Sequence, residues 1–214
     1  MILCFGEISW DRLMLVDNIP KPGEQTFCHH VMDIPGGCTL NTAVHLAMMG
    51  EEVLLGGNDI GKDLFGEKLL DHLKKIHLKS TIQKKNPYGT PRCDVILDGK
   101  SRERSFVLHH KGIQTFRPEM VEKIDLSDIE IAFIDPYLKQ ASSAMLELIQ
   151  NRCRKIWLQD ISPDDPRVGL GDIVQISLKE STSVDQVKQI ASQYFRGRCQ
   201  AVFVTAGKQG AYLM

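Results

Sequence analysis

Residues 131–158 read IAFIDPYLKQASSAMLELIQNRCRKIWL and contain two short apolar runs on either side of a helical pattern. We expect β-strands at Ile131–Ile134 and Ile156–Leu158, and a helix over Ser142–Gln150, where apolar residues recur at helical spacing. A helix between two such runs is typical of a βαβ unit, whose strands lie parallel in one sheet. This stretch therefore predicts an α/β fold.

The same alternation extends outward over most of the chain. We expect further helices over Phe65–Lys75, over Val184–Phe195 and from about Thr39 to Gly50, and further strands at Ile2–Phe5, Val53–Leu55, Ile173–Ile176 and Ala201–Thr205. The pattern predicts a doubly wound, mostly parallel sheet flanked by helices.

Two segments, Leu13–Ile34 and Thr90–His109, break this rhythm with β-type alternation and turn residues but no helical period. Asp98-Gly99 between two apolar runs is a strong hairpin signal. We expect the two segments to form a small β-sheet lid (13–34 and 90–109) over the carboxyl end of the main sheet, where open α/β sheets bind ligands. Residues 1–12, 35–89 and 110–214 would then form the α/β core.

The composition limits the classes of function. The chain has 214 residues, 43 % hydrophobic and 25 % charged, and 26 basic against 27 acidic residues give a net charge of −1. This balance offers no general attraction for nucleic acid or anionic membranes, so we expect neither as a partner. Without a signal peptide or a bilayer-spanning stretch, and with six scattered cysteines, a cytoplasmic protein with reduced thiols and no metal site is expected.

Two motifs point to a polyol site. In Gly6-Glu7-Ile8-Ser9-Trp10-Asp11 the acid follows a strand and a glycine, so the Asp11 carboxylate can accept two hydroxyl hydrogen bonds at the sheet edge. In the segment 35–43, PGGCTLNTA, Gly36-Gly37 allow close approach of a ligand to a helix start, and the Asn41 amide can donate and accept. Alone, each motif also fits an ordinary loop or glycine turn.

Two further motifs could bind phosphate. Gly56–Lys62 fits GxxxxGK, but Asp63 replaces the Ser or Thr of a P-loop and Asp59 would repel phosphate. If the chain were a P-loop NTPase, Lys62→Ala would abolish nucleotide binding. In Thr205-Ala206-Gly207-Lys208-Gln209-Gly210, two glycines after a strand can present backbone N–H groups to phosphates, although such turns are common.

Taken in order, these motifs resemble the ribokinase-like (PfkB-type) carbohydrate kinases. The resemblance covers residues 1–214 and rests on the strand-G-E-x-x-x-D opening, G-G-x-x-x-N-x-A, G-N-D-x-x-G-x-x-x-x-G and T-x-G-x-x-G. The G-G-x-x-x-N-x-A segment looks most like those of fructokinases and 2-keto-3-deoxygluconate kinases. The resemblance implies ATP-dependent phosphorylation of a free sugar hydroxyl, with fructose or a related hexose or keto-sugar acid as acceptor. It also implies Mg²⁺ as a cofactor, and in some members of such a family a monovalent cation such as K⁺.

The resemblance also assigns residues. On the sugar side it places Asp11, Gly36, Gly37 and Asn41. On the nucleotide side it places Thr205, Gly207 and Gly210, together with Ser177 and Glu180 at the position of the family's N-x-x-E. Ser177 stands where the family has Asn, so the nucleotide contact at that position departs from the pattern.

The catalytic base is left unassigned. In this family it is the Asp of a G-A-G-D segment that follows T-x-G-x-x-G; here Gly169-Leu170-Gly171-Asp172 imitates it but leads into a strand, so we interpret Asp172 as a strand-entry residue. We expect that segments of a longer protein are omitted, rather than that the chain is a degenerate relative. Because a missing base costs roughly 10²–10⁴ in rate, the 214 residues alone should be nearly inactive.

Two expectations concern the wider role of the chain. The alternative to a kinase is a non-catalytic sugar-binding sensor on the same scaffold. An open lid edge would also pair with the lid of a second copy, which predicts a homodimer.

Overall fold

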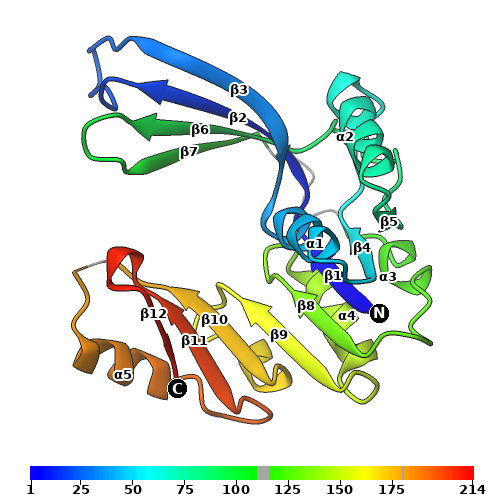
Figure 1. Ribbon diagram of the computed structural model, residues 1–214. Coiled ribbons are helices and arrows are strands. Elements are labelled where there is room, and N and C mark those ends of the chain that lie inside the picture. The colour runs from blue at the N-terminus through cyan, green and yellow to red at the C-terminus, as the bar shows by residue number, and fades with distance from the viewer. Residues whose placement is uncertain (110–115, 180) are drawn as a thin grey trace.

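A computed structural model describes residues 1–109, 116–179 and 181–214 and places them in two sheets (Figure 1). The larger sheet has eight strands in the order β12-β11-β10-β9-β8-β1-β4-β5, and every pair is parallel except β11–β12. Its strands are β1 (Ile2–Gly6), β4 (Val53–Gly57), β5 (Lys79–Ser80), β8 (Ile131–Ile134), β9 (Lys155–Gln159), β10 (Ile173–Ser177), β11 (Ala201–Thr205) and β12 (Ala211–Leu213). The predicted α/β fold is confirmed.

Helices cover both faces of this sheet because each buried strand is apolar on both sides. In β1, Leu3 and Phe5 join the core beneath α3 (Glu119–Glu122), α4 (Gln140–Ile149) and α5 (Val184–Ser192). Cys4 points the other way, into the core beneath α1 (Cys38–Met48) and α2 (Leu64–Lys75). Two short 3₁₀ helices, η1 (Pro166–Leu170) and η2 (Gly207–Gln209), complete the elements.

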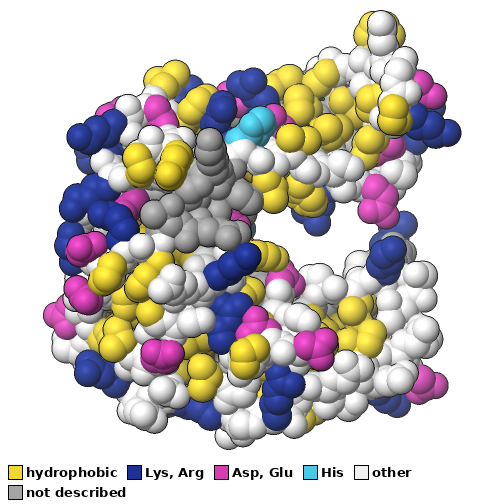
Figure 2. All heavy atoms as spheres, turned by 180° about the vertical axis from the view of Figure 1, so that it is seen from behind, with side chains coloured by type: hydrophobic (Ala, Val, Ile, Leu, Met, Phe, Trp, Pro, Cys, Tyr) yellow, Lys and Arg dark blue, Asp and Glu magenta, His cyan; other side chains and the backbone are white. Residues whose placement is uncertain are grey.

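The second sheet has four strands in the order β3-β2-β6-β7: β2 (Ser9–Val16), β3 (Cys28–Gly36), β6 (Arg92–Asp98) and β7 (Arg104–His109). The two predicted β segments therefore do combine, through the parallel pair β2–β6. The Asp98-Gly99 hairpin is confirmed as the β6–β7 turn. Figure 1 shows this sheet projecting over the side where β8–β11 end, and Figure 2 shows a hollow between the two parts.

Some element ends differ from the predictions. The predicted helix Val184–Phe195 ends at Ser192, and the edge strands β5 and β12 were not predicted. Both edge strands have only two or three residues, too few for a periodic signal. None of the described helices is long and apolar enough to cross a membrane.

Candidate active site

Three acidic residues stand directly after neighbouring strands of the main sheet. Glu7 follows β1, Asp135 follows β8 and Asp160 follows β9. Parallel strands end at one edge of a sheet, so the three carboxylates lie at the same edge, where α1 also begins. The candidate site is built at this edge.

Asp135 is fully buried and tied to three elements. Its carboxylate accepts hydrogen bonds from the Glu7 N–H (2.7 Å), the Thr39 hydroxyl at the start of α1 (2.6 Å) and the Tyr137 N–H (3.1 Å). Burial raises the pKa of Asp135 to about 6, although these hydrogen bonds oppose the shift. Asp135 thus joins the ends of β1 and β8 to α1.

Glu7 carries the most perturbed carboxyl group of the cluster. Burial, followed by repulsion from Asp135 and Asp11, raises its pKa to about 7. Burial also raises the pKa of Asp160. The same acids and burial raise the pKa of the Cys38 thiol to about 12, so this cysteine stays protonated and is not an activated nucleophile.

Asp11, expected at the edge of the main sheet after the first strand, lies on β2 of the second sheet, where it pairs with Ile34 of β3. Its carboxylate accepts a hydrogen bond from the Ser9 hydroxyl (2.6 Å). Burial raises the pKa of Asp11, and hydrogen bonds from Ser9 and the Gly37 N–H partly oppose this. The carboxylate is therefore held between the lid and the start of α1.

The Gly36-Gly37 turn leaves no space for side chains. A Cβ on Gly36 would overlap the Asp11 carboxylate. Gly37 has φ +93°, and a Cβ there would overlap the Glu7 carbonyl oxygen and lie 2.8 Å from the Ile8 Cα. The predicted need for glycine at this turn thus has a physical cause, the close packing of Asp11 and the β1–β2 connection against it.

Asn41 lies in the first turn of α1, and its N–H donates to the Gly37 carbonyl (3.1 Å). Its exposed side chain lines a groove of about 370 Å³, with His45 of α1, with Met49 directly after this helix and with Gln159 at the end of β9. Asp11 and Asn41 thus contact the same glycine turn, Asp11 by the packing of its carboxylate against Gly36 and Asn41 through the Gly37 carbonyl. Whether one ligand bridges their side chains remains a prediction.

Four of the predicted nucleotide-side residues lie together at the ends of β10 and β11. Ser177 and Thr205 are paired across these strands, and their hydroxyl oxygens are 3.0 Å apart. The turn that follows Thr205 needs left-handed backbone at Gly207 (φ +54°) and Gly210 (φ +90°), and open space surrounds Gly210. Glu180 lies outside the described residues.

Asp172 lies at the opposite edge of the sheet, directly before β10. It is buried, accepts a hydrogen bond from the Ile156 N–H (2.8 Å) and pairs with Arg198 (3.0 Å). Its position matches the interpretation as a strand-entry residue, and it stabilises the beginnings of the strands.

The P-loop-like segment does not form an open phosphate cradle. The Ile60 N–H donates to the Gln83 carbonyl (2.9 Å), and the Gly61 N–H donates to the Thr90 hydroxyl (3.0 Å). Asn58 is buried and holds both backbone groups of Ile8 with its amide (2.8 and 3.0 Å). These groups are occupied within the protein, so the geometry disfavours the P-loop alternative.

Sequence reasoning missed Asp135 and Asp160 as site residues and singled out Asp11, not Glu7, in the first motif. Each of the three acids is the first or second residue after an apolar strand, the same signal that drew attention to the first motif. Their mutual proximity depends on the order of strands in the sheet, which local sequence patterns do not give.

Comparison with known proteins gives the family. The profile of the "pfkB family carbohydrate kinase" matches residues 1–214. The chain belongs to this family. Adenosine kinase from Saccharomyces cerevisiae is 33 % identical to it over 93 residues, which are 42 % of this chain and 26 % of that protein.

Solved structures show that the pfkB-family fold extends over the whole chain. Ribokinase from Giardia lamblia superposes with a TM-score of 0.84 at 15 % identity, over 100 % of this chain and 71 % of that one. Fructokinase from Xylella fastidiosa with bound ATP has a TM-score of 0.74 at 22 % identity, over 100 % and 74 %. The sequence matches to curated relatives span only about a quarter of their length.

The carboxyl cluster of this pfkB-family chain predicts a pH dependence of stability. Asp135 and Glu7 have pKa values raised from 3.8 to about 6 and from 4.5 to about 7 in the folded state. The folded state therefore binds more protons than the unfolded state between about pH 4 and 7, so stability should fall as pH rises through this window and level off above it.

Urea denaturation between pH 4.5 and 7.5 measures this slope. Asp135→Asn should flatten it, whereas Asp71→Asn, an exposed carboxylate on α2, should leave it unchanged. An equal slope in all three proteins would show that the buried cluster does not titrate in this range.

Proposed function

We propose that this protein is an ATP-dependent kinase that phosphorylates a hydroxyl group of a free sugar. The observation that carries the proposal is the Asp11 carboxylate, which accepts a hydrogen bond from the Ser9 hydroxyl and packs against Gly36 at the glycine turn where α1 begins. A half-buried carboxylate with remaining acceptor capacity suits a ligand with several hydroxyl groups. The family supports the same chemistry.

The geometry suggests how the residues would divide the work. Asp11 and Asn41 would bind sugar hydroxyls from either side of the Gly36-Gly37 turn. The turn that contains Gly207 and Gly210 would contact nucleotide phosphates at the same edge of the sheet. Phosphoryl transfer needs mainly such positioning and charge stabilisation, and closure of the lid would exclude competing water.

Magnesium would accompany ATP in this chemistry and would offset phosphate charge. Among the described residues, no group of three His, Cys, Asp or Glu side chains is placed to hold a metal ion. The described ends of β10 and β11 offer hydroxyl and backbone groups rather than carboxylates, so we assign no metal ligand there.

For the acceptor we propose fructose, or a related hexose or keto-sugar acid. The Gly36–Ala43 segment supports this choice, and a fructokinase is among the structures with the same fold. Lid residues Lys100, Arg102 and Arg104 would suit an anionic sugar, but they are exposed beside a turn.

The test measures ADP formation by the complete protein with a panel of sugars, together with sugar binding by calorimetry, because the 214 residues alone are expected to be nearly inactive. Sugar-dependent ADP formation, strongest with a ketohexose or keto-sugar acid, is the expected result. Sugar binding without ADP formation would favour the sensor alternative. Absence of both would refute the proposal.

We also propose a homodimer formed through the lid. The edge strands β3 and β7 carry exposed apolar side chains, among them Val31, Met32, Phe106 and Leu108. Unpaired strand edges with apolar side chains favour pairing with another sheet. Light scattering should then give twice the chain mass of 24.1 kDa.

A further inference from the structure

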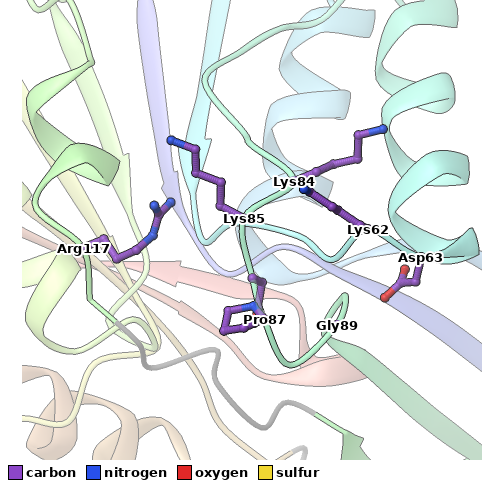
Figure 3. A pocket seen from close by; sticks show the side chains of 8 residues that line it. Lys62, Asp63, Lys84, Lys85, Pro87, Gly89 and Arg117 are labelled. Atoms are coloured by element: carbon purple, nitrogen blue, oxygen red, sulfur yellow. The ribbon is translucent and has the colours of Figure 1, made fainter.

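A cationic cavity of about 610 Å³ lies away from the proposed sugar and nucleotide positions, beside the start of α2. It is lined by Lys62, Lys84, Lys85 and Arg117, together with Asp63 and Gly89. Figure 3 shows Lys85 and Arg117 approaching one another from two different segments, with Lys62 and Asp63 on the α2 side. We call this space the lysine cavity.

Two of its cations are balanced by neighbouring acids. Lys84 points toward α2 (Figure 3) and pairs with Glu67 at 2.6 Å, and Arg117 forms an ion pair with buried Asp59. The acid that lines the cavity, Asp63, is occupied as the N-cap of α2. It accepts hydrogen bonds from the Gly66 and Thr90 backbone and from the Thr90 hydroxyl.

Two cations remain in excess. Lys62 and Lys85 are exposed, and neither forms an ion pair with any residue that the structure describes. Lys85 also stands close to Lys123, whose pKa is lowered by desolvation and then by repulsion from Lys85. Like charges gathered around one hollow are mutually destabilising until an anion enters between them. Figure 2 shows Lys and Arg side chains gathered along this side of the molecule.

The cavity lies where the β6–β7 hairpin of the lid joins the core. Gly89 is followed by Thr90, whose backbone and hydroxyl bind Asp63, and Arg92 begins β6. Arg117 stands just before α3, on the core side of the cavity. An anion held by Lys85 and Arg117 would therefore connect the segment that leads into β6 with the segment that leads into α3.

Asp59 links the cavity to the candidate active site. It receives the Gln83 N–H at 3.2 Å and pairs with Arg117, while the preceding Asn58 fixes Ile8 in the connection to β2. Ile8 lies three residues before Asp11. The wall of the lysine cavity and the strand that carries Asp11 thus share one buried hydrogen-bonded connection.

We propose that the lysine cavity binds a phosphate dianion, either free or as the terminal group of a small metabolite, and that occupancy restrains the base of the lid. Ammonium and guanidinium groups form charge-assisted hydrogen bonds with phosphate oxygens, and the volume exceeds that of the ion alone. This site is separate from the sugar and nucleotide positions of the proposed function.

The test titrates inorganic phosphate, glucose 6-phosphate and uncharged glucose into the chain by calorimetry, at ionic strength held constant with sodium chloride. The double variant Lys62→Ala/Lys85→Ala removes the two excess cations, and Lys21→Ala/Lys74→Ala removes the same charge from the β2–β3 connection and the far end of α2. We expect phosphate affinity to fall by roughly tenfold or more in the first variant and to be unchanged in the second.

The arms distinguish the sources of the anion. If the Lys62→Ala/Lys85→Ala variant loses binding of glucose 6-phosphate, the cavity is a site for a phosphorylated metabolite. If the unchanged chain binds only inorganic phosphate and this variant loses that binding, the cavity is a site for the free ion. Equal affinity in the two double variants, or no binding above the chloride control, would overturn the proposal. Hydrogen exchange should slow at residues 90–98 when phosphate binds, and unchanged exchange there would overturn the restraint on the lid.

Discussion

Asp11→Asn should weaken sugar binding by roughly 10²-fold and lower kcat/KM by a similar factor. The substitution keeps the shape of the side chain but removes its charge and one acceptor oxygen. Hydrogen bonds to charged groups contribute about 1.5–3 kcal/mol each, and 1.4 kcal/mol is a tenfold change in affinity. Calorimetry with the best sugar of the panel measures the dissociation constant directly.

The matched control is Asp33→Asn, the same chemical change on the same sheet. Asp33 stands opposite Arg12 on β2, next to Asp11, and pairs with that arginine. Because consecutive residues of a strand point to opposite faces, Asp33 lies on the face of the sheet away from Asp11. The Asp33→Asn substitution should therefore leave sugar affinity unchanged. Comparable weakening by both variants would mean that the charge of the lid, rather than the Asp11 site, governs binding.

ATP affinity separates the two halves of the proposed site. The nucleotide positions belong to β10, β11 and the turn after Thr205, whereas Asp11 belongs to β2. Asp11→Asn should therefore leave ATP binding within about twofold of the unchanged chain. A parallel loss of ATP affinity would indicate that the variant disturbs the fold, and denaturation midpoints would then show it.

Much of the architecture could be predicted from local pattern. The strands Ile131–Ile134 and Ala201–Thr205 match the structure at both ends, because each is an apolar run bounded by polar residues. The lid hairpin was equally clear, since Asp98-Gly99 fixes a turn whatever its surroundings. Strands and turns whose sequence pattern is contained within about ten consecutive residues are the elements that can be predicted from the sequence.

The site was recovered less fully because its chemistry depends on burial. Nothing near Asp135 in the sequence shows that it accepts hydrogen bonds from both Glu7 and Thr39, which lie 128 and 96 residues away. The lysine cavity is a similar case. Lys62 drew attention only as part of a P-loop-like pattern, and its neighbours Lys85 and Arg117 come from segments that meet only in the folded chain.

Among substitutions that add one methyl group at the site, Gly37→Ala should damage the fold and the sugar site the most. An alanine at φ +93° carries strain of about 1–3 kcal/mol, and its Cβ would overlap the carbonyl oxygen of Glu7. The turn lies between β3 and α1, and the buried strand β1 directly precedes Glu7, so neither the turn nor the carbonyl can move away cheaply. We expect a large loss in the free energy of unfolding, together with weaker sugar binding because the Gly37 N–H moves away from Asp11.

Gly50→Ala, just beyond the other end of α1, separates strain from overlap. Gly50 has nearly the same backbone angle, φ +89°, but no atom lies within 4 Å of an added Cβ. Both variants carry the same backbone strain. The additional loss in the free energy of unfolding of Gly37→Ala therefore measures the close packing of the turn, and we expect urea denaturation to show at least about 2 kcal/mol. Equal losses would show that the glycine turn is loosely packed, and the position of Asp11 beside it, on which the proposed sugar site depends, would then not be fixed.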